Sequence, residues 1–218
     1  MTLEWIDGGG SLLDIGCSGG DLVLRAQGSF DLPIGIDVDV GKLAKARSES
    51  ESAEFQAASA EALPFRDGTF DVVTVLDVLE HTSRKELVLR EIGRVLKPGG
   101  SLVISVPSAG DFSFLDAQKS IAFSLGRKMM GRKGEAIGHP HYSLEEIVRA
   151  VGSSFTLVKT HRGGLLLFPL CGYALMLTDA LGLKRLSGAI RRLEEKDFVK
   201  DYGERSWHLM AEFKKGGP

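Results

Sequence analysis

A glycine-rich turn between a short apolar segment and a predicted helix constrains the fold of this chain more than any other feature. Leu12, Leu13 and Ile15 form the apolar segment, which is typical of a buried parallel strand. Residues 16–20, Gly-Cys-Ser-Gly-Gly, form the turn, and Asp21 can begin the helix. Glycines here allow close backbone approach or a positive φ, and the amide end of a helix favours polar or anionic groups. Such turns are often only structural, so a functional interpretation requires support from the next segments of the chain.

A second apolar segment, residues 33–37, ends in the carboxylate of Asp37. In doubly wound sheets, ligands bind outside the carboxyl ends of the strands, and an acidic residue ending the second strand can accept hydrogen bonds from both hydroxyls of a ribose. Asp37 is also a candidate N-cap for the helix predicted over residues 40–49. The two roles are compatible, since Asp39 or Val40 can begin that helix instead.

Four motifs, in their order along the chain, indicate the protein family. They occupy residues 12–20, 35–47, 60–73 and 91–100, and the last ends in Lys-Pro-Gly-Gly. With these motifs, the chain resembles the class I S-adenosylmethionine-dependent methyltransferases, in the type 11 group that includes ubiquinone and menaquinone biosynthesis enzymes. A dehydrogenase would share the first two motifs, but its loop continues as Gly-x-Gly-x-x-Gly, and the third glycine comes too early here.

The resemblance implies S-adenosyl-L-methionine as cofactor. The residues it implies for the cofactor site are Asp14, Gly16, Cys17, Ser18, Gly20, Asp37, Val38, Ser59, Ala60, Glu61, Asp77 and Val78. Ser18 stands where the family usually has the middle glycine of the loop, and Ser59 replaces the acidic residue that commonly faces the adenine amino group. We therefore expect Ser59 Oγ, the Ala60 amide, Val38 and Leu63 to contact the adenine, and we expect binding to survive both changes.

Residues 77–81, Asp-Val-Leu-Glu-His, come directly after the predicted fourth strand and hold the candidate base. Methyl transfer is an in-line displacement, so the protein supplies orientation, desolvation and, for a hydroxyl or carbon acid, a base. His81 suits that role because the unperturbed pKa of a histidine, about 6.5, leaves it basic near neutral pH. The alternative is that His81 packs beside the helix that begins near Ser83.

The same five residues are similar to an acidic-x-x-Glu-His element that some quinone-ring O-methyltransferases use for a divalent metal, which would lower the pKa of a catechol hydroxyl. That pattern is frequent in the wider group without a metal, so we expect none here. Similar proteins also place the segment containing His141 and Tyr142 over the cofactor cleft, which implies substrate contacts for both residues.

The order of the predicted elements gives an α/β fold. We expect a doubly wound, mostly parallel, seven-stranded sheet with an antiparallel last strand, which is a Rossmann-like methyltransferase fold. Strands are predicted at 11–15, 33–37, 53–57, 71–76, 101–106, 155–161 and 206–213, and helices at 21–27, 40–49, 83–96 and 143–151. The Pro-Gly-Gly sequence at 98–100 is expected to end the third helix.

We expect residues 1–218 to form a single methyltransferase domain with two insertions, a lid or substrate segment at 108–142 and an apolar helical segment at 163–203. Residues 163–183 carry only one charge, and cations follow at Lys184, Arg185, Arg191 and Arg192. Three interpretations stay open: buried or dimer-forming helices, a membrane-surface hairpin that reaches a lipid substrate, and a true span, which the interruptions by Pro169, Gly172 and Asp179 disfavour.

The amino-acid composition limits the classes of binding partner and the cellular compartment. The net charge of −2 gives no electrostatic case for nucleic acid, and the two cysteines indicate reduced thiols in a cytoplasm. The first ten residues lack the basic start and apolar core of a signal peptide. We therefore predict a cytoplasmic methyltransferase acting on a small or lipidic acceptor, with peripheral contact at the inner membrane face and a homodimer as open possibilities. The alternative function is a catalytically inactive, cofactor-binding or regulatory protein.

Overall fold

Strands and helices alternate along most of the chain. The computed structural model describes residues 2–109, 140–164, 171, 174–175, 177–178 and 181–217. The strands are β1 (Ser11–Ile15), β2 (Leu32–Asp37), β3 (Glu54–Ala57), β4 (Phe70–Leu76), β5 (Leu96–Pro107), β6 (Phe155–Gly163) and β7 (His208–Lys215). The α-helices are α1 (Asp21–Ala26), α2 (Val40–Glu49), α3 (Lys85–Val95), α5 (Leu144–Val151) and α7 (Lys184–Val199), and short 3-10 helices are η1 (Thr2–Glu4), η2 (Leu79–His81) and η5 (Gly203–Arg205).

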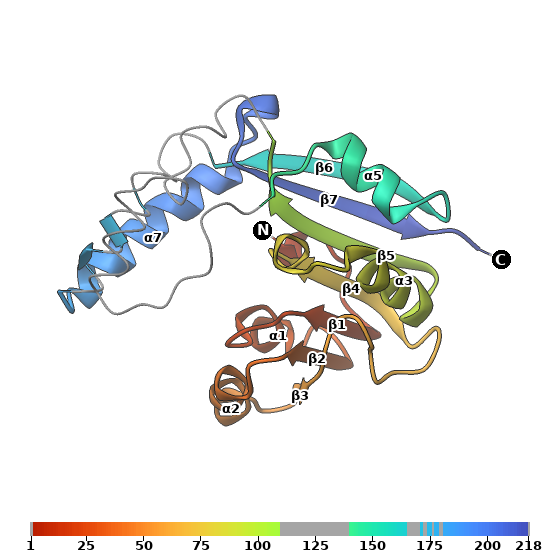
Figure 1. Ribbon diagram of the computed structural model, residues 1–218. Helices are drawn as coiled ribbons and strands as arrows, with labels where there is room; N and C mark the ends of the chain where they lie inside the picture. Colours follow the sequence, from red (N-terminus) through yellow and green to blue (C-terminus); the bar gives the residue numbers. More distant parts are fainter. Residues whose placement is uncertain are drawn as a thin grey trace. The chain divides into compact units, whose positions relative to one another are not determined.

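The strands form one seven-stranded sheet in the order β3-β2-β1-β4-β5-β7-β6 (Figure 1). The strands β3, β2, β1, β4 and β5 run parallel to one another. Leu13 of β1 pairs with Ile34 of β2 and with Val73 of β4, and Val73 pairs with Leu102 of β5. The last strands are antiparallel. The predicted Rossmann-like fold is therefore confirmed, and the carboxyl ends of β1, β2 and β4 meet at one edge of the sheet.

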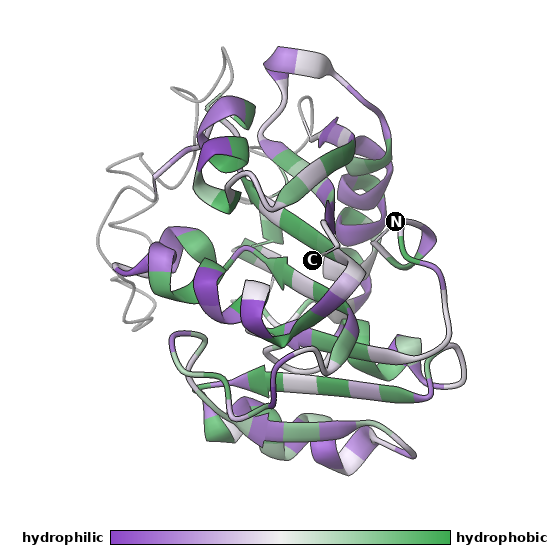
Figure 2. Cartoon of the chain, turned by 90° about the vertical axis from the view of Figure 1, so that its right-hand side faces the viewer, coloured by the Kyte–Doolittle hydropathy of each residue, from purple (hydrophilic) through white to green (hydrophobic). Residues whose placement is uncertain are grey.

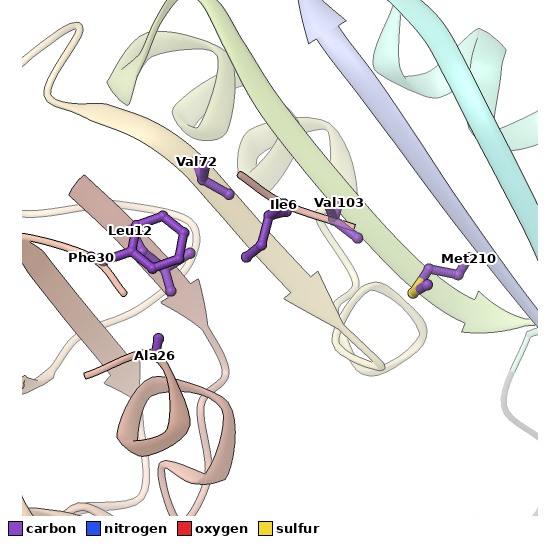
Figure 3. Close-up of a cluster of buried hydrophobic side chains, with 7 residues drawn as sticks. All are labelled: Ile6, Leu12, Ala26, Phe30, Val72, Val103 and Met210. Atoms are coloured by element: carbon purple, nitrogen blue, oxygen red, sulfur yellow. The ribbon is translucent and has the colours of Figure 1, made fainter. Parts of the chain in front are cut away.

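The hydrophobic core is formed by the apolar strands and by the helices that cover them. One cluster of buried side chains, drawn in Figure 3, consists of Ile6, Leu12, Ala26, Phe30, Val72, Val103 and Met210. A second cluster consists of Cys17, Val23, Leu43, Ala46 and Phe55. Helix α1 contributes to both, through Ala26 and Val23, so its position after the glycine turn is fixed by packing. Figure 2 shows the helices banded in hydrophilic and hydrophobic colours, as expected where one face packs and the other is solvated.

Helix α3 and the start of β5 differ from the prediction. Val88, Ile92 and Val95 are buried at helical spacing, but the helix ends at Val95 because Leu96 already has extended dihedrals. Strand β5 begins there and pairs with Phe70, and its register with β4 shifts before Val72. The Pro-Gly-Gly sequence at 98–100 therefore lies in the strand at this irregularity instead of in the turn that was expected to end the helix.

The chain divides into two compact units. The first comprises residues 1–106, 144–160 and 210–218, and the second comprises residues 107–143 and 161–209. The second unit contains α7, whose end is held by a hydrogen bond from Gly164 N to the carbonyl oxygen of Asp197. Within the residues that the structure describes, no helix is both long and apolar enough to cross a membrane.

Candidate functional site

The glycine turn after β1 has a backbone that only small residues can adopt. Gly16 has φ 73° and Gly20 has φ 80°. A Cβ on Gly20 would lie 2.7 Å from the Phe55 ring and 2.8 Å from the Ala46 Cβ, so glycine is required there. The amides of Gly16 and Cys17 both donate to the carbonyl oxygen of Ile36, at 2.8 and 2.9 Å. The turn is thereby tied to the neighbouring strand β2.

Asp37 is bound to this turn through its side chain. The backbone N–H of Ser18, which has φ 51°, donates to Asp37 Oδ2 at 2.8 Å, and the N–H of Asp39 donates to Asp37 Oδ1 at 2.8 Å. Each carboxylate oxygen keeps lone-pair capacity for a further donor. Asp39, and not Asp37, caps α2, because its Oδ1 accepts from the amides of Gly41 and Lys42. The cap role considered for Asp37 is therefore filled by another residue.

Asp14 is a buried carboxyl at the end of β1. Its side chain accepts a hydrogen bond from Thr74 Oγ1 at 2.7 Å. Burial raises the pKa of Asp14 to about 7, the Thr74 hydrogen bond opposes that rise, and the charge of Asp37 adds to it. Asp14 therefore carries a proton for much of the time near neutral pH. Burial also raises the pKa of the Cys17 thiol to about 12, which keeps it protonated and unreactive.

Asp77 comes directly after β4 and has an unusual backbone. Its φ is 54°, a value that non-glycine residues seldom adopt and that is concentrated at functional sites. Its amide donates to the carbonyl oxygen of Ser105, and Ser105 Oγ donates to Asp77 Oδ1, both at 3.0 Å. Asp77 is nevertheless an exposed residue. Val78 lies against Gly16, where a Cβ would come within 2.4 Å of Val78 Cγ2.

The loop after β3 carries Ser59 and Ala60, which are expected to contact the adenine of the cofactor. Ser59 Oγ accepts from the Glu61 amide at 3.2 Å, which leaves the hydroxyl hydrogen available as a donor. The Glu61 carboxylate is paired with the guanidinium of Arg84 and accepts from Thr82 Oγ1 at 3.4 Å. Val38 is 75% exposed and offers an apolar surface beside Asp37.

Helix η2 holds one exposed and one buried candidate. The His81 side chain is exposed. Glu80 is 8% exposed, and its Oε2 has no hydrogen-bond partner among the described residues. Burial, and secondarily the charge of Asp77, raises the pKa of Glu80 to about 7. No group of three or more His, Cys, Asp or Glu side chains in the described part of the chain is arranged to hold a metal ion.

His141 and Tyr142 belong to the second unit, whereas the other candidates belong to the first. His141 Nδ1 lies 2.7 Å from the carbonyl oxygen of Ser108. Tyr142 is buried, and its amide donates to the carbonyl oxygen of Pro107 at 2.9 Å.

Two supporting residues, Thr74 and Ser105, were missed by the sequence analysis. Each interrupts an apolar strand with a hydroxyl, Thr74 in Val-Val-Thr-Val and Ser105 in Val-Ile-Ser-Val. A polar side chain in such a run signals a buried hydrogen bond, and that signal was present in the sequence.

The side chains of this site fit a cationic ligand with a ribose. The twelve residues implied for the cofactor include four carboxylates, one of them paired with Arg84, and no lysine or arginine. Carboxylates accept hydrogen bonds from ribose hydroxyls and attract ammonium and sulfonium charges, whereas a pyrophosphate would be repelled. The open space around Gly19, where an added Cβ meets nothing within 4 Å, leaves the loop backbone accessible.

Comparison with known proteins agrees with this chemistry. Residues 13–104 match the family model described as a methyltransferase domain. The chain is 35% identical over 111 residues to the 27-O-demethylrifamycin SV methyltransferase of Amycolatopsis mediterranei, covering 48% of this chain and 39% of the relative. It is 36% identical over 105 residues to the ubiquinone/menaquinone biosynthesis C-methyltransferase UbiE of Hahella chejuensis, covering 44% and 42%. It is 33% identical over 132 residues to the ubiquinone biosynthesis O-methyltransferase of Pseudomonas fluorescens, covering 54% and 57%.

The chain thus spans about half the length of the curated relatives it matches. Among solved structures, the YcgJ protein of Bacillus subtilis superposes with a TM-score of 0.63 at 17% identity, covering 100% of this chain and 96% of that one. The [4+2]-cyclase SpnF gives a TM-score of 0.61 at 21% identity, covering 98% and 77%. Likeness at these identities shows the fold alone.

The fold and the site together define an α/β domain of the Rossmann-like methyltransferase type. Residues 13–104 are similar to the methyltransferase-domain family, and the relatives of the chain include enzymes of ubiquinone and menaquinone biosynthesis.

Proposed function

We propose that this protein transfers a methyl group from S-adenosyl-L-methionine to an oxygen or carbon atom of a small or lipidic acceptor. The observation that carries the proposal is the position of Asp37 at the end of β2. The Ser18 and Asp39 amides hold its carboxylate, and each carboxylate oxygen can still accept a further hydrogen bond. The alternative, an inactive cofactor-binding or regulatory protein, has less support, because the named relatives are methyltransferases.

In this proposal, Asp37 accepts hydrogen bonds from the ribose hydroxyls, and Asp77 attracts the ammonium group of the methionine part. The glycine turn at residues 16–20 contributes its backbone. Ser59 Oγ can donate to a ring nitrogen of the adenine, while Val38 covers the ring. When bound, the cofactor supplies an electrophilic methyl group on a sulfonium sulfur.

The acceptor side of the reaction involves His81. Its exposed imidazole can take the proton from an acceptor hydroxyl or carbon acid as the new bond forms. This exposure makes the imidazole accessible to an acceptor from solvent. We also propose His141 and Tyr142 as contacts for the acceptor.

A radiolabel assay tests this function. The purified chain is incubated with S-adenosylmethionine carrying a labelled methyl group and a panel of catechols, prenylated quinols and lipid-linked sugars. Transfer of label to any acceptor, abolished by boiling the protein, supports the proposal. Cofactor binding without transfer to any member of the panel would favour the regulatory alternative.

We further propose that the acceptor is amphipathic and that the protein meets it at the inner membrane face through residues 163–185, with a homodimer as the competing use of that segment. Residues 165–170, 172–173, 176 and 179–180 of this segment lie outside the described residues. The apolar sequence of residues 163–183 and the cations after it support this proposal.

A further inference from the structure

The loop of residues 58–63, which carries the residues expected to contact the adenine, ends at Leu63, and two side chains of α3 hold both backbone polar groups of Leu63. The Leu63 amide donates to Glu91 Oε2 at 2.8 Å, and its carbonyl oxygen accepts from Arg94 Nη2 at 3.0 Å. Arg94 Nε and Nη2 also donate to the two Glu91 carboxylate oxygens, both at 2.8 Å. A joined carboxylate and guanidinium therefore satisfy backbone groups that a neighbouring strand would ordinarily satisfy.

The Arg94 guanidinium is fully committed to this arrangement. Its Nη1 donates to the carbonyl oxygen of Phe65 at 2.7 Å and to Asp67 Oδ1 at 2.8 Å, so every N–H donor of the side chain is used. The Arg94 side chain is 29% exposed and that of Glu91 is 15% exposed, which shields the pair partly from water. A lysine at position 94 would keep the charge but could not hold Leu63, Phe65 and Glu91 together.

The other end of the loop is held by β2. The Ala58 amide donates to the carbonyl oxygen of Asp37 at 3.1 Å. Between the two ends, the Ala62 amide donates to the carbonyl oxygen of Ser59 at 3.2 Å and closes a turn. Ser59 begins this turn, so its position relative to Asp37 depends on where α3 holds Leu63.

The connection from α3 to the start of β4 does not require the Arg94 side chain. The Gly68 amide donates to the carbonyl oxygen of Arg94 at 2.9 Å, and the Thr69 amide donates to that of Val95 at 2.7 Å. These backbone bonds already join the end of the helix to the segment that enters the strand. The side-chain bonds to Leu63 are additional to them and act on the loop.

We infer that Glu91 and Arg94 are positioning residues for the cofactor, because they hold the loop of residues 58–63 in the arrangement that receives the adenine. This inference rests on the proposed function, since the loop receives an adenine only if S-adenosylmethionine binds. The two side chains act through the backbone of Leu63. A loop that is already ordered binds a ligand without the cost of ordering it, so the effect of the pair should be seen in cofactor affinity.

Titration calorimetry with S-adenosylhomocysteine tests the inference. Arg94→Lys should weaken binding about tenfold, because lysine keeps the charge but releases the loop. Arg90→Lys is the matched control on the same helix, since Arg90 is exposed and donates no hydrogen bond to the described loop of residues 58–63. Glu91→Gln retains an oxygen for the Leu63 amide and should weaken binding by a smaller factor. It carries the same test if Arg94→Lys does not fold.

A double-mutant cycle identifies the route of the effect. Ser59→Ala should weaken binding by the native protein about fivefold, through the lost hydrogen bond to the adenine. It should have little further effect in the Arg94→Lys protein, because Ser59 is already displaced there. Asp37→Ala should weaken binding by the same factor with Arg94 or Lys at position 94, since the ribose is bound apart from the adenine loop.

Hydrogen exchange of the cofactor-free proteins examines the loop itself. The amides of residues 58–63 should exchange faster in Arg94→Lys than in the native protein, and those of residues 11–20 should not. Thermal unfolding shows whether each variant is folded at the temperature of the titration. The inference is overturned if Arg94→Lys and Glu91→Gln both keep native affinity, or if the loss in Arg94→Lys is additive with Ser59→Ala. A native chain that binds no S-adenosylhomocysteine would contradict the proposed function itself, and the inference with it.

Discussion

The backbone N–H of Ser18 donates a hydrogen bond to Asp37 Oδ2 at 2.8 Å, joining the glycine turn after β1 to the carboxylate that ends β2. Ser18 has φ 51°, and the bond from its amide holds the turn and the carboxylate in one arrangement. Preorganised groups bind a ligand without the cost of ordering them. Cofactor affinity and folding stability should therefore both respond to changes in this turn and in the buried groups that support it.

Asp37→Ala should weaken binding of S-adenosylmethionine by about 1 to 3 kcal/mol, because charge-assisted hydrogen bonds to the ribose are lost. Titration calorimetry measures the change. Asp39→Ala is the control: it removes the cap of α2, costing about 1 kcal/mol of folding stability, and should leave cofactor affinity in place. Equal affinity of Asp37→Ala and the native protein would remove Asp37 from the ribose role.

Gly20→Ala and Gly19→Ala should differ sharply in urea unfolding. Gly20 has φ 80°, and an added Cβ would approach Phe55 and Ala46 at 2.7 and 2.8 Å, so roughly 2 to 4 kcal/mol of stability should be lost. Gly19 has nothing within 4 Å of an added Cβ. If the two variants were equally stable, the packing of the turn against α2 and β3 would be incorrectly described.

The buried carboxyl of Asp14 predicts a pH dependence of stability. Its pKa is raised from 3.8 to about 7 in the folded state, so the folded protein holds a proton that the unfolded chain releases. Stability from this group is present below pH 4 and is lost as the pH rises through about 7. Asp14→Asn keeps an acceptor for Thr74 and should abolish this pH-dependent loss of stability, which is roughly 4 kcal/mol for a shift of about three pKa units. Unfolding curves from about pH 4 to 8 that gave both proteins the same slope would contradict this assignment.

Glu80 should contribute in the same direction, since burial raises its pKa from 4.5 to about 7. Glu80→Gln should therefore gain stability relative to the native protein as the pH rises from about 5 to about 8. Glu91→Gln serves as the opposite control, because the Arg94 hydrogen bonds lower the pKa of Glu91, and its stabilising effect is lost as the pH falls. A Glu80→Gln profile parallel to the native one would show that the native carboxyl is solvated or paired.

His81→Ala should reduce turnover by about 10² to 10⁴ with cofactor affinity unchanged, because a general base acts in the transition state and not in cofactor binding. Steady-state kinetics and titration calorimetry measure the two quantities separately. A variant that retains the native rate would assign proton removal to another group.

The central sheet could be predicted because its signals are local. Apolar segments ending in glycine or aspartate define β1 and β2, and the buried spacing of Val88 and Ile92 defines α3. Whether Asp37 or Asp39 caps α2 could not be decided, since both precede the helix and the choice depends on the Ser18 amide, which is distant in sequence.

The orientation of α7 lies beyond sequence patterns for a similar reason. Its leucines and cations are visible in the sequence, but the helical periodicity of these residues does not say which side of the helix packs against the protein. That choice depends on hydrogen bonds with Thr178 and Tyr202, which satisfy polar groups that would otherwise favour solvent. The isolation of Glu80 Oε2 is likewise a property of its tertiary surroundings.

Calorimetric titration of the purified chain with S-adenosylhomocysteine and, in parallel, with NAD distinguishes a methyltransferase site from a dinucleotide site. The residues assigned to the cofactor include no lysine or arginine and four carboxyl groups, of which Asp14 is largely protonated near neutral pH and Glu61 is paired with Arg84, so Asp37 and Asp77 are the carboxylates that matter here. We therefore predict binding of S-adenosylhomocysteine and no binding of NAD, whose pyrophosphate these carboxylates would repel. Binding of NAD in preference, or no binding of S-adenosylhomocysteine, would contradict the proposed cofactor and with it the proposed function.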